Sequence, residues 1–138
     1  MTIKKFEDLK VWKHAFSLTQ NVYELTQQNG FERDYALKDQ IRRASISVMN
    51  NISEGIDRSG NKEFIQFLAI AKGSAAEIRS MLYIAESQGY ISENQFLELK
   101  KHCIEISRMI GGLIKYLKNT SYKGTKFIVK EPRDNYDA

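Results

Sequence analysis

The chain has 138 residues, the length of one ordinary domain, and 42% of them are apolar, which excludes a disordered protein. One cysteine excludes an internal disulfide, no apolar run reaches the roughly 18–20 residues of a membrane span, and the N-terminus has no apolar signal segment. We therefore expect a cytoplasmic protein with no membrane partner, and its net charge of +4 does not by itself identify a nucleic-acid binder.

The first predicted helix spans about residues 6–28 and ends before Asn29-Gly30. Residues at 3–4 spacing predict its buried face: Leu9, Trp12, Phe16, Thr19, Tyr23 and Thr26. A second apolar stripe recurs every seven residues at Val11, Leu18 and Leu25.

The second predicted helix spans about residues 35–54, with Gly55 placed as a C-cap glycine. Its main apolar face consists of Leu37, Ile41, Ala44, Val48 and Ile52. An adjacent arc of smaller and mixed residues contains Ser45, Ile46, Met49, Ser53 and Ile56. This helix therefore has two faces that could pack.

The third predicted helix follows a short loop, with Asn61 as its N-cap. Its core face consists of Phe64, Phe67, Leu68, Ala71, Ala75, Ile78, Leu82 and Ala85. A separate row holds only small residues, namely Ala69, Gly73, Ala76 and Ser80, and it would let a neighbouring backbone come close.

The fourth predicted helix opens at Ser92, with Gln95 at the capping-box position. Its apolar face is the narrowest of the four and consists of Phe96, Leu99, Cys103, Ile106, Ile110, Leu113, Ile114 and Leu117. From Asn119 the periodicity ends; Lys126–Lys130 could pair as a short strand, and we expect the rest of the tail to be flexible.

Together the four helices predict an all-α fold, an antiparallel up-down-up-down four-helix bundle, because short connections favour antiparallel neighbours. The bundle domain covers residues 1–118, and a C-terminal tail covers residues 119–138. Three of the helices carry more apolar surface than a single bundle needs. This surplus predicts self-assembly into a homo-oligomer.

Enzymatic sites typical of such bundles do not match the chain. A di-metal carboxylate site needs Glu three residues before His, whereas Val11 precedes His14 and Leu99 precedes His102 at this spacing. We expect both histidines to be solvated and Cys103 to be a small buried hydrophobe. The prediction is a non-enzymatic protein with no catalytic residues, no metal site and no cofactor.

Two sets of polar residues are candidates for binding or packing. Arg42, Arg43, Arg58 and Lys62 are candidate contacts to the phosphates of RNA or DNA, against the alternative of an ordinary solvated surface. The residues that could fix the register of helices or subunits are Arg43, Glu54, Gly73 and Glu77. The two glutamates are either exposed carboxylates or partners of Arg42 or Arg43 across helices.

A family pattern runs through these helices. It consists of Phe6-Glu-Asp-Leu-Lys-Val-Trp12, Tyr23-Glu-Leu-Thr26, Leu37-x-x-Gln-Ile-Arg-Arg-Ala44, Asn51-Ile-Ser-Glu-Gly55, Arg58, Glu63-Phe64 and Phe67-Leu-Ala-Ile-Ala-Lys-Gly-Ser74. In this order the segments resemble the bacterial four-helix-bundle family encoded in intervening sequences of 23S ribosomal RNA genes, also labelled S23 ribosomal protein. The resemblance covers about residues 6–118.

The resemblance implies a homopentamer around a central channel and no established enzymatic activity. It also implies a distant relation to the accessory variability proteins of diversity-generating retroelements, which are basic pentamers that bind nucleic acid and a reverse transcriptase. Two functions therefore stay open. The protein either binds RNA or DNA electrostatically, or it is an interaction scaffold for a protein partner, such as an acidic protein or a reverse transcriptase.

Overall fold

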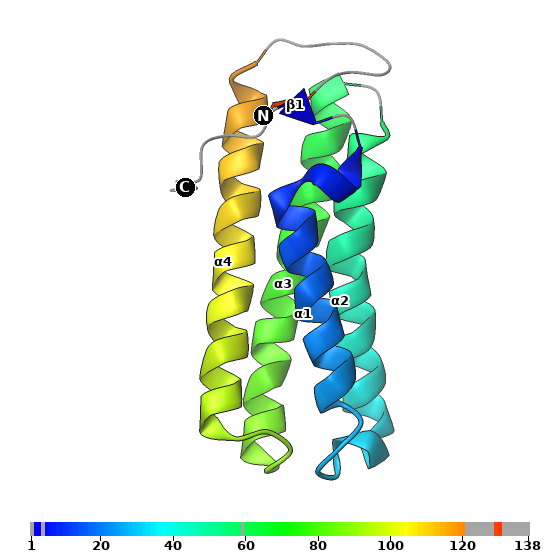
Figure 1. Cartoon of the computed structure of the whole chain (residues 1–138), viewed down its shortest axis with the longest axis vertical. Coiled ribbons are helices and arrows are strands. Elements are labelled where there is room, and N and C mark those ends of the chain that lie inside the picture. The colour runs from blue at the N-terminus through cyan, green and yellow to red at the C-terminus, as the bar shows by residue number, and fades with distance from the viewer. Residues whose placement is uncertain (1, 4, 59, 121–128, 131–138) are drawn as a thin grey trace.

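A computed structural model describes residues 2–3, 5–58, 60–120 and 129–130 of the chain. The described residues form four long helices, α1 (Lys10–Leu25), α2 (Tyr35–Ile56), α3 (Gly60–Ser87) and α4 (Glu93–Lys118). In Figure 1 they run down, up, down and up beside one another, so helices that follow each other in the chain are antiparallel. The predicted all-α four-helix bundle is therefore confirmed.

Short elements flank the helices. The 3-10 helices η1 (Phe6–Asp8) and η2 (Phe31–Arg33) precede α1 and α2. The strands β1 (Thr2–Ile3) and β2 (Val129–Lys130) pair antiparallel, with Thr2 opposite Lys130. A short strand was predicted within residues 126–130, and it is confirmed for the last two of them. The predicted flexibility of the tail falls on residues 121–128 and 131–138, which lie outside the described residues.

The buried face of α1 differs from the predicted one. The segment from η1 to the end of α1 buries Leu9, Val11, Ala15, Leu18, Thr19, Val22 and Thr26. Phe16 is instead 43% exposed, and Trp12 and Tyr23 are only partly buried. The predicted face is wrong in its aromatic residues, and Val11 and Leu18 of the second stripe line the core.

Small residues explain this orientation, because α1 meets α2 through them. Thr19 Oγ1 lies 2.8 Å from the carbonyl oxygen of Ala15 and 3.2 Å from that of Ser45 on α2. A large aromatic side chain at this crossing would hold the helices apart. The Trp12 ring lies outside it, stacked on Phe16 with 5.5 Å between the ring centres.

Gly55 lies inside α2 and is buried, so its predicted role as a C-cap is wrong. A Cβ atom at this position would lie 2.7 Å from Phe64 Cδ1 and 3.1 Å from Phe67 Cβ, both on α3. Glycine at position 55 therefore allows the close approach of two helices at their connecting turn.

Polar caps define where α2 and α4 begin. Asp34 accepts a hydrogen bond from the Leu37 backbone N–H, and its other carboxylate oxygen accepts one from the Tyr90 hydroxyl at 3.0 Å. The capping box of Ser92 and Gln95 is confirmed, since the side chain of each accepts from the backbone N–H of the other.

Asn61 does not act as the predicted N-cap, because it lies within the first turn of α3. Its Nδ2 atom donates to the carbonyl of Leu117 at 3.0 Å, in the last turn of α4. The side chain thus satisfies an acceptor that a helix C-terminus leaves free, and it connects the start of α3 to the end of α4.

The remaining predicted core residues of α2, α3 and α4 are buried, apart from Phe67 and Ile114, which are partly buried. Cys103 is 1% exposed, as expected for a small buried hydrophobe. No helix in the described ranges combines the length and the apolar character needed to cross a membrane.

Candidate functional site

Exposed basic residues are concentrated in one half of the bundle. This half contains the starts of α1 and α3 and the ends of α2 and α4, which lie together in Figure 1. We call it the basic half. Its exposed Lys and Arg residues are Lys5, Lys10, Lys13, Arg58, Lys62, Lys72, Arg108, Lys115 and Lys118. They outnumber the acidic residues of the same half, which are Glu7, Asp8, Glu54, Asp57 and Glu63.

The opposite half has the reverse balance among its described residues. Its basic residues are Arg33, Lys38, Arg42, Arg43, Arg79, Lys100 and Lys101. Slightly more numerous are its acidic residues, Glu24, Glu32, Asp34, Asp39, Glu77, Glu86, Glu93 and Glu98. Glu105 lies midway along α4, level with His14, and belongs to neither half. Although the net charge of the whole chain is modest, the charge is therefore unevenly distributed along the bundle axis, with the excess of positive charge in the basic half.

The four candidate phosphate contacts do not form one cluster. Arg58 and Lys62 flank the turn between α2 and α3 and belong to the basic half, where Arg58 also forms a 2.7 Å ion pair with Glu54. Arg42 of α2 packs against α1. Its Nε donates to Thr26 Oγ1 at 2.8 Å, and its guanidinium lies 4.3 Å from the centre of the Tyr23 ring.

Arg43 is exposed and makes no hydrogen bond or ion pair with the described residues. It lines a shallow groove between α2 and α3 together with Glu77 and the serine pair Ser47 and Ser74, whose Oγ atoms lie 2.8 Å apart. The structure thus brings two of the four proposed register residues, Arg43 and Glu77, to one groove.

The other two register residues lie elsewhere. Glu54 bonds to Arg58 one turn on, rather than to Arg42 or Arg43 within its own subunit. Gly73 is exposed on α3, and a Cβ atom there would meet nothing within 4 Å. Contacts of Glu54 or Gly73 with a second subunit stay predictions.

The outward face of α3 carries a row of small residues, with the exposed charged residues Lys72, Glu77 and Arg79 beside it. Ala69, Gly73, Ala76 and Ser80 are all exposed along it. Large apolar side chains flank this row, with Ile70 at 53%, Tyr83 at 50% and Ile84 at 49% exposure. No helix of the same subunit covers this face among the described residues.

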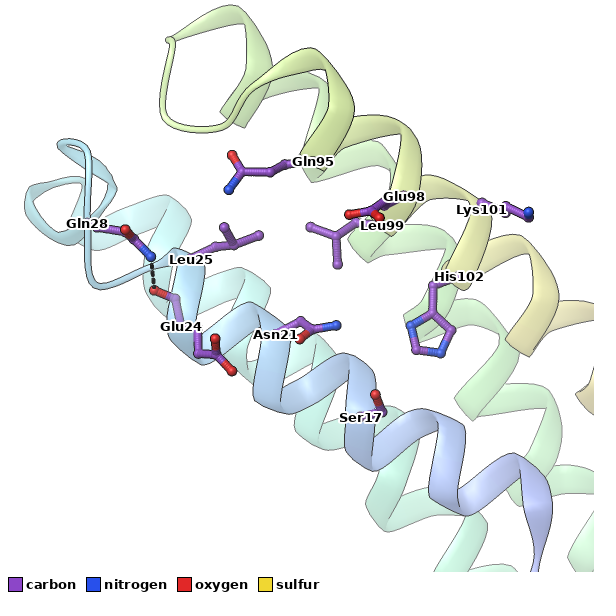
Figure 2. A pocket seen from close by; sticks show the side chains of 10 residues that line it. All are labelled: Ser17, Asn21, Glu24, Leu25, Gln28, Gln95, Glu98, Leu99, Lys101 and His102. Carbon is purple, nitrogen blue, oxygen red and sulfur yellow. Dashed lines mark hydrogen bonds between the residues drawn. The ribbon is translucent and has the colours of Figure 1, made fainter.

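A polar groove of about 560 Å³ separates α1 from α4, the two neighbouring helices that pack least closely (Figure 2). It is lined by Ser17, Asn21, Glu24, Leu25 and Gln28 from α1, and by Gln95, Glu98, Leu99, Lys101 and His102 from α4. The lining residues offer hydrogen-bond donors and acceptors, and they include both acidic and basic side chains.

His102, which lines this groove, meets His14 of α1. His14 Nδ1 lies 3.3 Å from His102 Nε2 and 3.3 Å from Glu105 Oε1. The imidazole rings meet edge to face, with 5.5 Å between their centres. These three residues form a group of nitrogen and oxygen ligands of the kind that transition metals bind.

Burial lowers the pKa of His102 below its usual value of 6.5, and the neighbouring His14 lowers it further, while Glu105 acts in the opposite direction. The neutral form of His102 is therefore favoured at pH 7, and in that form one of its two ring nitrogens is unprotonated. The expectation that it is a solvated surface histidine is wrong, because it is half-buried against His14.

Sequence reasoning missed this group for a specific reason. The di-metal motif has Glu three residues before His. Here Glu105 instead follows His102 by three residues, and the second histidine comes from another helix. A His-x-x-Glu spacing on a helix was a visible signal, since residues three apart share one face. The approach of His14 depends on the α1–α4 packing, which local sequence does not encode.

The sequence of this helical framework matches a known protein family. The family model described as 23S rRNA-intervening sequence protein matches residues 7–112. The chain belongs to this family. The match spans α1, α2 and α3 and all but the last six residues of α4.

A solved structure has the same fold as this 23S rRNA-intervening sequence protein. It is a protein with unknown function from the S23 ribosomal protein family of Bacteroides thetaiotaomicron VPI-5482, 22% identical, with a TM-score of 0.69. The similarity covers 76% of this chain and 98% of that one. Among proteins with curated descriptions, none matches the sequence.

Proposed function

We propose that the protein is a non-enzymatic homo-oligomer that binds RNA or DNA through phosphate contacts of its basic half. The observation that carries this proposal is the gathering of exposed Lys and Arg residues around the α2–α3 turn and the end of α4. Lys62, Lys115 and Lys118 make no hydrogen bond or ion pair with other described residues, so their charges are available.

Unpaired backbone N–H groups also lie at this end. They belong to the N-termini of α1 and α3, while the C-termini of α2 and α4 at the same end carry the opposite partial charge, so the side chains supply the net positive charge. Arg58 and Lys62 flank the start of α3. Such contacts fix a nucleic-acid backbone without reading its sequence.

Assembly would strengthen this weak field. The outward face of α3 offers a surface for a second copy, because Ala69, Gly73 and Ala76 let a backbone approach closely and Ile70 and Ile84 supply apolar area. A pentamer would carry roughly +20 in formal charge, since each chain carries +4. Phosphate binding of such a particle would fall steeply with salt.

A scaffold for a protein partner is the second function, and the same exposed face of α3 favours it. In that case Ile70, Tyr83 and Ile84 would contact a partner protein instead of a second copy. The two functions differ in what they predict for nucleic acid. A scaffold without nucleic-acid binding would show no affinity for RNA or DNA even at low salt.

The test is a fluorescence-anisotropy titration of labelled RNA and duplex DNA with the full-length protein at 50 mM salt. The double variant Lys62→Gln/Lys118→Gln removes two charges from the basic half, and Arg33→Gln/Lys101→Gln removes two from the other half. We expect at least a tenfold loss of affinity for the first variant and less than a threefold loss for the second. Equal losses would contradict the role of the basic half.

A further inference from the structure

The group formed by His14, His102 and Glu105 has the composition of a metal site. His14 comes from α1, while His102 and Glu105 lie three residues apart on the same face of α4. One ligand atom from each residue lies within 4.8 Å of the other two. Two imidazoles and a carboxylate form the same donor set that several protein zinc sites use.

The distances match those around a small divalent ion. Zinc binds imidazole nitrogen and carboxylate oxygen at about 2.0–2.2 Å, so two ligand atoms at a tetrahedral angle lie about 3.3–3.5 Å apart. His14 Nδ1 lies 3.3 Å from His102 Nε2 and 3.3 Å from Glu105 Oε1. The remaining pair can close by rotation of the Glu105 side chain, which is 49% exposed.

Without a cation, these three atoms do not have enough hydrogen-bond donors among them. If His14 Nδ1 carries a proton, it can donate to the His102 nitrogen or to the Glu105 carboxylate, and the other acceptor depends on water. If His14 Nδ1 is unprotonated, it can accept a hydrogen bond from His102 Nε2, but its lone pair then also faces the Glu105 carboxylate. A cation with two positive charges interacts favourably with all three atoms at once.

We propose that His14, His102 and Glu105 bind one divalent transition-metal ion of the zinc type, which joins α1 to α4. Three protein ligands leave at least one coordination position for water. The ion links the pair of neighbouring helices that pack least closely, at the edge of the polar groove in Figure 2. This inference is independent of nucleic-acid binding and of assembly.

Stability provides the first readout. A metal that binds the folded chain and not the unfolded chain raises the melting temperature, and the rise grows with the logarithm of the free metal concentration above its dissociation constant. We expect Zn²⁺ to raise the melting temperature of the full-length protein, after prior treatment with a chelator, and the chelator to reverse the rise. The control is Asp39→Asn, which removes an exposed carboxylate on α2 and should respond to Zn²⁺ as the wild type does.

Binding itself is measured by calorimetry with Zn²⁺ and by absorption with Co²⁺, whose visible spectrum reports imidazole ligands. Trp12 adds a third signal, because this single tryptophan lies two residues from His14 and a bound Co²⁺ ion should quench its fluorescence. We expect one ion per chain, and at least tenfold weaker binding in His14→Asn and in His102→Asn.

Glu105→Gln keeps the test decisive even if the half-buried His102 variant fails to fold, because this position is exposed. We expect Glu105→Gln to weaken Zn²⁺ binding by at least threefold without changing the helix content seen by circular dichroism. Wild-type protein that binds Zn²⁺ no more tightly than His14→Asn and Glu105→Gln would overturn the proposal. So would an equal loss of affinity in Asp39→Asn.

Discussion

Gly55 on α2 faces the ring of Phe64 on α3 so closely that a Cβ atom at position 55 would lie 2.7 Å from Phe64 Cδ1. This contact lies next to the α2–α3 turn, where Arg58 and Lys62 are exposed. The glycine is a packing residue, although it is adjacent to the predicted end of a helix.

Gly55→Ala should destabilise the bundle. Alanine gains up to about 1 kcal/mol of helix propensity over glycine, but overpacking in a core costs about 1–3 kcal/mol. Because the methyl group would meet a ring and the Phe67 Cβ rather than a flexible chain end, we expect a net loss of about 1–2 kcal/mol. Urea unfolding followed by circular dichroism measures the loss.

Gly73→Ala is the matched control for that variant. Gly73 also lies inside a helix, but an added Cβ would meet nothing within 4 Å. The gain in propensity should therefore appear undiminished, as about 0.5–1 kcal/mol of added stability per subunit. An equal loss of stability in both variants would contradict the packing explanation for Gly55.

Gly73→Leu should weaken assembly while leaving the fold of the subunit intact. The larger side chain projects from the exposed face of α3 and would keep a second backbone away from the row of Ala69, Gly73 and Ala76. Light scattering during size-exclusion chromatography should show a smaller particle than wild type. Gln20→Leu, an exposed change on α1, should keep the wild-type particle size.

Some of these features could be predicted from sequence and others could not. The capping box of Ser92 and Gln95 is local, so its residues are recognisable without a structure. The orientation of α1 was not predictable, since two apolar stripes compete and packing of Thr19 against Ser45 decides between them. The meeting of His14 and His102 has the same cause, because it depends on how two distant helices align.

The Cys103 thiol should not react in the folded protein. Burial raises the pKa of Cys103 from 9.0 to about 12, so the reactive thiolate is scarce at pH 8. A thiol reagent such as Ellman's reagent should label this residue only as fast as the chain opens, and urea should accelerate the reaction. Rapid labelling in native conditions would contradict the burial of Cys103.

The raised pKa also predicts how stability changes with pH. The folded state holds the thiol proton up to about pH 12, whereas the unfolded chain loses it near pH 9.0. The contribution of Cys103 is therefore complete below pH 9 and declines as pH rises from about 9 to 12. Urea midpoints of wild type and Cys103→Ala, measured at pH 8 and pH 10.5, isolate the contribution of Cys103. The difference in stability between the two proteins should be smaller at pH 10.5.

Ser92→Ala should shorten or fray the start of α4. The substitution removes the acceptor for the Gln95 N–H and breaks the reciprocal pair of the capping box. Loss of an N-cap of this kind costs about 1 kcal/mol. Thermal unfolding measures the cost, and Ser87→Ala near the end of α3, where the hydroxyl bonds only within its own helix, should change stability by less than half as much.

The most direct test of the central claim is the salt dependence of RNA binding by the full-length protein. If the basic half holds phosphates, the logarithm of the binding constant should fall linearly with the logarithm of salt concentration. The slope should become shallower in Lys62→Gln/Lys118→Gln but not in Arg33→Gln/Lys101→Gln. Absence of binding at low salt, or the same slope in all three proteins, would contradict the proposed function.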